Sequence, residues 1–126
     1  MNWSVLAVVM AGGALGAAIR FALGSWLLRQ ADGFPWSTLA VNLAGSFAVG
    51  FLFAWLENRH GALHWRAFLI VGMLGAMTTY SALMLECLLL GRAGRPGMLF
   101  AYLALSLVLG LALVWVGARA GGLLRP

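Results

Sequence analysis

Polar residues interrupt a long apolar run in the middle of this sequence. Residues 72–81, GMLGAMTTYS, lie inside an apolar stretch from about residue 67 to about residue 90, which is long enough to cross a bilayer as a helix. Glycine is a weak helix former, and threonine and serine compete for backbone hydrogen bonds. At mid-membrane depth a broken helix requires protein or water to satisfy the freed backbone groups. We interpret the stretch as a helix broken at its centre, which presents carbonyl and hydroxyl oxygens to a small ligand. An unbroken helix with small residues packed on a neighbour is the alternative.

Hydrogen-bonding side chains recur at helical spacing in two other apolar segments. Thr38 and Asn42 are four residues apart, as are Tyr102 and Ser106, so each pair shares a helix face. Together with Ser81 they would form a row of donors. The alternatives are that Asn42 only joins helices and that the hydroxyls bond carbonyls of their own helices. For Asn42, which offers both a donor and an acceptor, we favour a position facing a pore.

Two charged residues lie within apolar segments, where a charge by default faces a cavity or a partner. Arg20 lies about two turns from the end of its segment, so we expect it to attract anions into a vestibule, with extension toward the headgroups as the alternative. Glu86 is the one acid deep in an apolar segment. It is either a cation or proton site, or a carboxylate that is hydrogen-bonded or paired near the interface, and the sequence leaves both open.

No residue pattern indicates catalysis. The sequence contains neither a recognisable nucleophile–base pair nor a glycine-rich phosphate loop. His60 and His64 are four residues apart, but Gly61 lies between them and no cysteine, aspartate or third histidine is near, which disfavours a metal site. The single cysteine, Cys87, is expected to be a small buried apolar residue.

Composition places these residues in a membrane. Of the 126 residues, 63% are hydrophobic and 9% charged, whereas soluble domains have roughly 25% charged residues. The six tryptophans lie at or near the ends of the apolar segments, as in the aromatic belts of membrane proteins. We therefore predict an all-α integral membrane protein with one domain, residues 1–126, and a retained first segment. Its predicted transmembrane spans are residues 3–28, 36–56, 65–90 and 98–118.

The basic residues are all arginines and most lie near span ends, so the net charge of +5 indicates contact with lipid rather than with nucleic acid. Four spans place both termini on one side. That side has four arginines, and the other has three, or four if Arg20 reaches it. Because this positive-inside bias is close to zero, we predict insertion in both orientations and an antiparallel dimer. In the first span, Gly12, Gly16 and Gly24 form a small-residue stripe that would pack either between chains or within one chain.

In their order and spacing these motifs resemble the Fluc fluoride channel family, also called CrcB. The resemblance covers the whole chain and rests on residues 12–17 (GGALGA) with Arg20, 37–42 (STLAVN) with 45–47 (GSF) and Gly50, 72–79 (GMLGAMTT) with Ser81 and Glu86, and Tyr102 with Ser106.

This resemblance implies an antiparallel dual-topology dimer with two pores in the bacterial inner membrane, through which fluoride leaves the cytoplasm. It implies a structural, non-transported Na⁺ at the dimer centre, held by main-chain carbonyls of Gly75 and Thr78. It also implies a fluoride pathway formed by Thr38, Asn42, Tyr80, Ser81, Tyr102 and Ser106. Ring edges of two phenylalanines belong to the same family pattern, because an aromatic edge carries partial positive charge.

One motif departs from the family. Where the family has Phe-Ser-Thr-Phe, this chain has Tyr80, Ser81, Ala82 and Leu83. Tyr80 keeps an aromatic edge, whereas Leu83 has neither ring nor donor. The departure bears on conduction and selectivity, and raises the alternative of a heterodimer whose second subunit supplies the missing phenylalanine.

Two other functions fit the size of the chain. A small dual-topology exporter of cationic drugs would need a carboxylate in the first span, and that span has no acid. A non-conducting subunit would fit Leu83, but the other pathway residues count against it. The sequence therefore favours a homodimeric fluoride channel without enzymatic activity.

Overall fold

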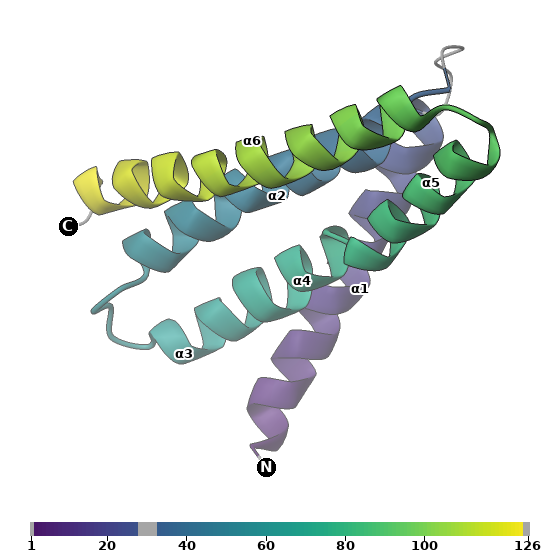
Figure 1. The fold of residues 1–126 in the computed structure, drawn as a ribbon. Coiled ribbons are helices and arrows are strands. Elements are labelled where there is room, and N and C mark those ends of the chain that lie inside the picture. Colours follow the sequence, from purple (N-terminus) through teal and green to yellow (C-terminus); the bar gives the residue numbers. More distant parts are fainter. Residues whose placement is uncertain (1, 28–32, 125–126) are drawn as a thin grey trace.

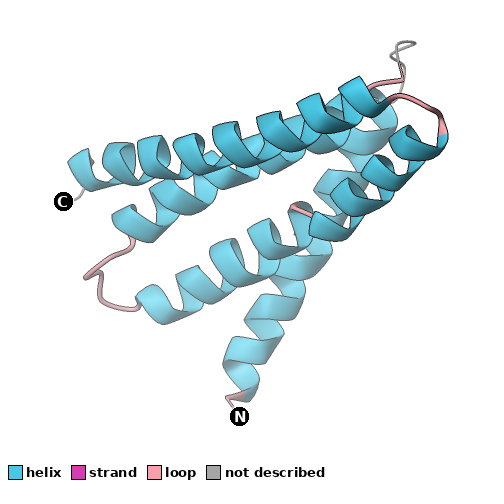
Figure 2. Cartoon of the chain, in the orientation of Figure 1, coloured by secondary structure: helices cyan, strands magenta, loops and turns pink. Residues whose placement is uncertain are grey.

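A computed structural model describes residues 2–27 and 33–124, and all regular structure within them is helical. The third long segment consists of several consecutive helical pieces that run from Ala62 to Arg92 (Figures 1 and 2). In chain order the elements are α1 (Trp3–Leu27), α2 (Trp36–Trp55), α3 (Ala62–Trp65), the π-helix η1 (Arg66–Leu74), α4 (Gly75–Met77), α5 (Tyr80–Arg92) and α6 (Pro96–Leu123).

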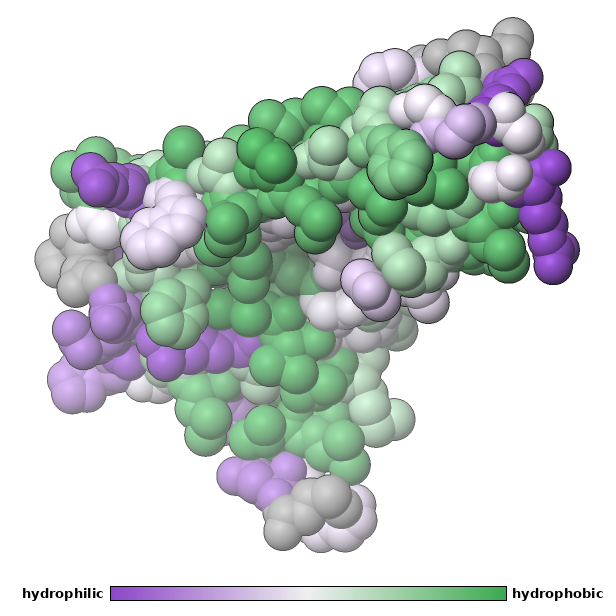
Figure 3. Space-filling view, viewed as in Figure 1, coloured by the Kyte–Doolittle hydropathy of each residue, from purple (hydrophilic) through white to green (hydrophobic). Residues whose placement is uncertain are grey.

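Four helical segments of the described chain are long and apolar enough to cross a membrane, which confirms the predicted all-α class with four spans. They are Trp3–Ser25, Trp36–Trp55, Ala62–Arg92 and Pro96–Leu123. The last two extend beyond the predicted spans 65–90 and 98–118, because helical hydrogen bonding continues past the apolar run. Leu28, at the end of the first predicted span, lies outside the described residues. Apolar residues cover the middle of the molecule, and hydrophilic ones gather toward its ends (Figure 3).

Helices α2 and α6 lie side by side and run in the same direction (Figure 1). Glycines bring their backbones together. A Cβ atom on Gly50 would overlap the carbonyl oxygen of Val114, and one on Gly117 would overlap that of Phe47. Small residues at helix contacts permit this approach within a bilayer, where apolar burial alone does not drive helices together.

Helix α1 packs in the same way against the third segment. A Cβ atom on Gly12 would overlap the carbonyl oxygen of Phe68, and one on Gly16 that of Met73. These two glycines therefore pack within the chain, which decides between the alternatives left open by the sequence. Gly13 and Gly24 meet no atom within 4 Å of an added Cβ. The first-span stripe is thus in contact at two of its glycines and open at Gly24.

The third segment changes helical type along its length. Residues 66–74 form a π-helix, in which hydrogen bonds link residues five apart and the turns are wider. At its end the N–H of Gly75 reaches the carbonyls of Ile70 and Gly72. The segment ends at Arg92. Gly94 then adopts a left-handed φ of 67°, which reverses the chain toward α6.

A small apolar cluster fixes α5 between α2 and α6. It consists of Leu39, Leu83, Cys87, Leu90 and Tyr102, with Cys87 buried as expected. Tyr102 is fully buried. Because Leu83 belongs to this cluster, the position that departs from the family motif contributes to the packing of the fold.

Candidate functional site at the broken helix

The third segment is broken between Met77 and Tyr80, as predicted, and the alternative of an unbroken helix is wrong. Thr78 has φ −83° and ψ 153°, and Thr79 has φ −152° and ψ 120°, so both residues are extended. The Thr78 hydroxyl donates to the Leu74 carbonyl at 2.9 Å, which closes the first half. The Thr79 hydroxyl accepts from the Ala82 N–H at 3.2 Å and caps the second half. The interruption appears as a short loop in Figure 2.

Asn42 of α2 pairs with the backbone of the break. Its Nδ2 donates to the Thr79 carbonyl at 3.2 Å, and its Oδ1 accepts from the Thr79 N–H at 2.9 Å. One amide thus replaces both hydrogen bonds that Thr79 loses by leaving the helix, as a buried backbone group requires. The amide retains a second N–H and a second lone pair. Asn42 therefore supports the break and can also offer a donor to the cavity that it lines.

The break changes the surroundings of two carbonyls. In a continuous α-helix the N–H groups of Thr79 and Ala82 would donate to the carbonyls of Gly75 and Thr78, four residues earlier. Here those N–H groups donate instead to Asn42 Oδ1 and to the Thr79 hydroxyl. The two carbonyls deprived of their helical donors are the pair that the family resemblance implies as Na⁺ ligands. Hard backbone oxygens suit such an ion.

These groups share one cavity of about 610 Å³ between α2, the third segment and α6. The Ser106 hydroxyl, which lines it, is buried and has no hydrogen-bond partner among the described residues. A buried hydroxyl without a partner is costly, so this one is available to a ligand or a water. The predicted site residues that line the cavity are Asn42, Gly75, Thr78, Tyr80, Leu83 and Ser106.

Thr38 and Tyr102 are directed elsewhere, onto Glu86. The Thr38 hydroxyl donates to Glu86 Oε1 at 2.6 Å, and the Tyr102 hydroxyl donates to Glu86 Oε2 at 2.5 Å. These charge-assisted hydrogen bonds join α2, α5 and α6. Glu86 also lines a second cavity of about 530 Å³, which is formed mainly by residues 33–37 and the end of α5. The structure thus shows the hydrogen-bonded form of the two alternatives left open for this carboxylate.

Replacing Tyr102 with phenylalanine is expected to lower the free energy of unfolding by about 1.5–3 kcal/mol, because it removes a buried hydrogen bond to a carboxylate. The matched control is Tyr80→Phe, since within one copy the Tyr80 side chain is 74% exposed and its hydroxyl, unlike that of Tyr102, is not bonded to Glu86. Thermal unfolding in detergent micelles measures both. Equal midpoints for the two variants would contradict a stabilising Tyr102–Glu86 bond.

Arg20 lines a third cavity, of about 260 Å³, on the α1 side of the break. Thr38 and Thr79 also line this cavity, which therefore extends from the exposed guanidinium to the break. Such a position can concentrate anions beside the polar backbone. The vestibule role of Arg20 stays a prediction.

The residues of the predicted fluoride pathway therefore do not form one continuous row. Asn42, Tyr80 and Ser106 share the central cavity, whereas Thr38 and Tyr102 meet at Glu86. Ser81 is exposed and lies 3.1 Å from the Thr79 hydroxyl.

Thr79, to which no role was assigned from the sequence, is both the partner of Asn42 and the cap of α5. Its signal was present in the sequence. A threonine directly before an apolar helical run is typical of an N-terminal cap.

The fold and site define a multi-pass, all-helical membrane protein that contains a broken third helix. The family model described as "CrcB-like protein, Camphor Resistance (CrcB)" matches residues 7–118, and the chain belongs to this family. A protein of Xylella fastidiosa (strain 9a5c) named "Fluoride-specific ion channel FluC" is 51% identical over 121 residues, which cover 94% of this chain and 85% of that protein.

Other relatives with the same name match over nearly their full lengths. One from Xanthomonas euvesicatoria pv. vesicatoria (strain 85-10) is 52% identical, and the match covers 94% of this chain and 91% of that protein. One from Thermus thermophilus is 45% identical and covers 93% of each chain.

Proposed function

We propose that the protein is a fluoride-selective channel through which F⁻ leaves the cytoplasm passively. The observation that carries the proposal is the cavity at the break, in which Asn42 and Ser106 present hydrogen-bonding groups among mainly apolar side chains of membrane-spanning helices. The shared family and the name of its relatives support the choice of ion. Isolated donors that replace part of an ion's water shell favour entry without trapping the ion, as conduction requires.

In this proposal, anions gather at Arg20 and pass the break along Asn42, Tyr80 and Ser106. The exposed ring of Tyr80 lies at the rim of the cavity, where its edge can face an anion. Thr38, Ser81 and Tyr102 complete the proposed pathway. The hydroxyls of Thr38 and Tyr102 each have one proton and donate it to Glu86, so in this proposal they can donate to F⁻ only when those bonds open.

The working unit in this proposal is an antiparallel homodimer of oppositely inserted copies. Gly75 and Ser81 are exposed beside the break, as is Tyr80. Polar groups and a broken backbone are not stable against lipid tails, so a second copy covering this face would shield them. The near-equal distribution of arginines between the two sides supports insertion in both directions.

A structural Na⁺ at the dimer centre belongs to the same proposal, held by the carbonyls of Gly75 and Thr78 from each copy. The redirected N–H groups of Thr79 and Ala82 support this assignment. The ligands would be backbone oxygens, because no group of three or more His, Cys, Asp or Glu side chains suited to a metal occurs within the described residues. When bound, the ion would satisfy carbonyls that the break leaves without helical donors.

Fluoride efflux from liposomes that contain only this purified chain tests the function. We expect rapid F⁻ release without Cl⁻ release, which would establish a self-sufficient homodimer and show that a second aromatic edge at Leu83 is dispensable. No F⁻ release from protein that still runs as a dimer would contradict the homodimeric channel. Recovery of release with a second family subunit would then indicate the heterodimer. Release of both anions would contradict selectivity.

A further inference from the structure

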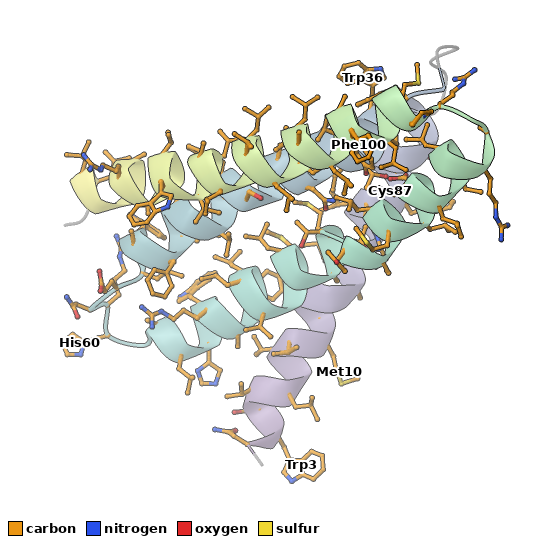
Figure 4. All side chains as sticks on the ribbon, viewed as in Figure 1. Trp3, Met10, Trp36, His60, Cys87 and Phe100 are labelled. Atoms are coloured by element: carbon orange, nitrogen blue, oxygen red, sulfur yellow. The ribbon has the colours of Figure 1, made fainter. Side chains whose placement is uncertain are left out.

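A cavity of about 360 Å³ lies at the corner where α2 turns into α3, away from the broken helix. Two tryptophans of the predicted aromatic belt contribute to it, one from each helix, together with Arg59 and His60 of the turn. Figure 4 shows His60 at this corner, and Figure 3 shows hydrophilic residues gathered at the same end of the molecule. The complete lining is Trp55, Leu56, Arg59, His60, Trp65 and Leu69.

The arginine of this cavity is held in place by an aromatic ring. The guanidinium carbon of Arg59 lies 3.8 Å from the centroid of the Trp55 ring, within the range of a cation–π contact. Its Nε is buried and has no hydrogen-bond partner among the described residues. No acidic residue belongs to the lining. Arg59 is thus an oriented cation that no carboxylate of the cavity neutralises.

A second arginine connects the two helices at this corner. Arg66, at the start of η1, donates from Nη2 to the Leu56 carbonyl at 3.4 Å. This contact ties the last turn of α2 to the third segment and adds positive charge near the cavity. The corner therefore combines a fixed cation, a neighbouring positive charge and two indole rings of the predicted aromatic belt, which together favour an anionic amphiphile over a soluble ion.

We propose that this cavity binds the phosphate group of an anionic phospholipid. Arg59 donates to the phosphate in the fork geometry that arginine offers to such groups, and His60 and Trp65 belong to the same lining and can supply further donors. The glycerol and upper acyl carbons then pack on Trp65, which is 60% exposed. This inference is independent of fluoride conduction.

Native mass spectrometry of the full-length protein, purified in detergent, tests the proposal. The lipids added are phosphatidylglycerol, which has a net negative charge, and phosphatidylcholine, which has none. The test variant is Arg59→Gln, and the matched control is Arg92→Gln, at an exposed position at the end of α5. We expect the wild type and R92Q to retain phosphatidylglycerol preferentially, and R59Q to bind it roughly fivefold more weakly, as expected for one arginine near an anionic surface.

A further variant and a competition experiment keep the result interpretable. Arg59→Lys preserves the charge and should retain most of the preference, which distinguishes loss of charge from loss of folding if R59Q elutes abnormally. Equal retention by R59Q and R92Q, or equal retention of the two lipids by the wild type, would overturn the proposal. Displacement of phosphatidylglycerol by an equal concentration of inorganic phosphate would overturn the lipid assignment and indicate a soluble anion.

Discussion

Replacing Asn42 with leucine is expected to abolish fluoride release from liposomes. The substitution removes both partners of the Thr79 backbone, whose N–H and carbonyl now bond to the amide at 2.9 and 3.2 Å. Each buried group left unsatisfied costs about 1–3 kcal/mol, so the two together cost roughly 2–6 kcal/mol. Leucine also removes the spare N–H that the amide offers to the cavity. The measurement is F⁻ efflux, with the oligomeric state determined on the same preparation.

The oligomeric state separates the two roles of Asn42. Loss of flux from an intact dimer would support a donor in the pathway, whereas loss of the dimer would show that support of the break dominates. Ser25→Ala is the control for removing a polar group from a span. The Ser25 hydroxyl donates a hydrogen bond to the Ala22 carbonyl of its own helix at 2.9 Å. Normal flux in the Asn42 variant would contradict both roles.

Replacing Gly16 with alanine is expected to destabilise the fold by about 3 kcal/mol, at the upper end of the usual cost of overpacking. The added methyl group would overlap the Met73 carbonyl oxygen. A backbone oxygen cannot rotate aside as a flexible side chain can, so α1 must move away from η1. Because η1 leads directly into the break, this displacement should also disturb the cavity. Thermal unfolding in detergent and F⁻ efflux measure the two consequences.

Gly13→Ala is the matched control, three residues earlier on the same helix. No atom lies within 4 Å of a Cβ added there. Alanine should therefore be tolerated and should stabilise the helix by about 0.5–1 kcal/mol relative to glycine. Destabilisation of the assembled protein by G13A would instead identify Gly13 as a contact between copies. Similar melting of G16A and the wild type would contradict the close packing of α1 on η1.

Much of the fold could be predicted because a bilayer strongly restricts the length and composition of the segments that cross it. A helix that crosses it needs about 20 apolar residues, so segment length and tryptophan placement were sufficient to find four spans. The break was also predictable, since glycine, threonine and serine cluster at residues 72–81. The motifs indicated the family to which the chain belongs, and the match of the family model over residues 7–118 confirmed it.

The sequence by itself therefore determined the class of protein, the number of spans and the position of the break, because each depends on local composition and length. Only the tertiary structure decided which residues of different helices contact one another. Asn42 meets Thr79, Glu86 meets Thr38 and Tyr102, and Gly16 contacts η1 whereas Gly13 does not. The physical reason is that such partners depend on how the helices are rotated and offset. Helical spacing shows which residues share a face, but close packing of the glycine-bearing backbones decides what that face meets.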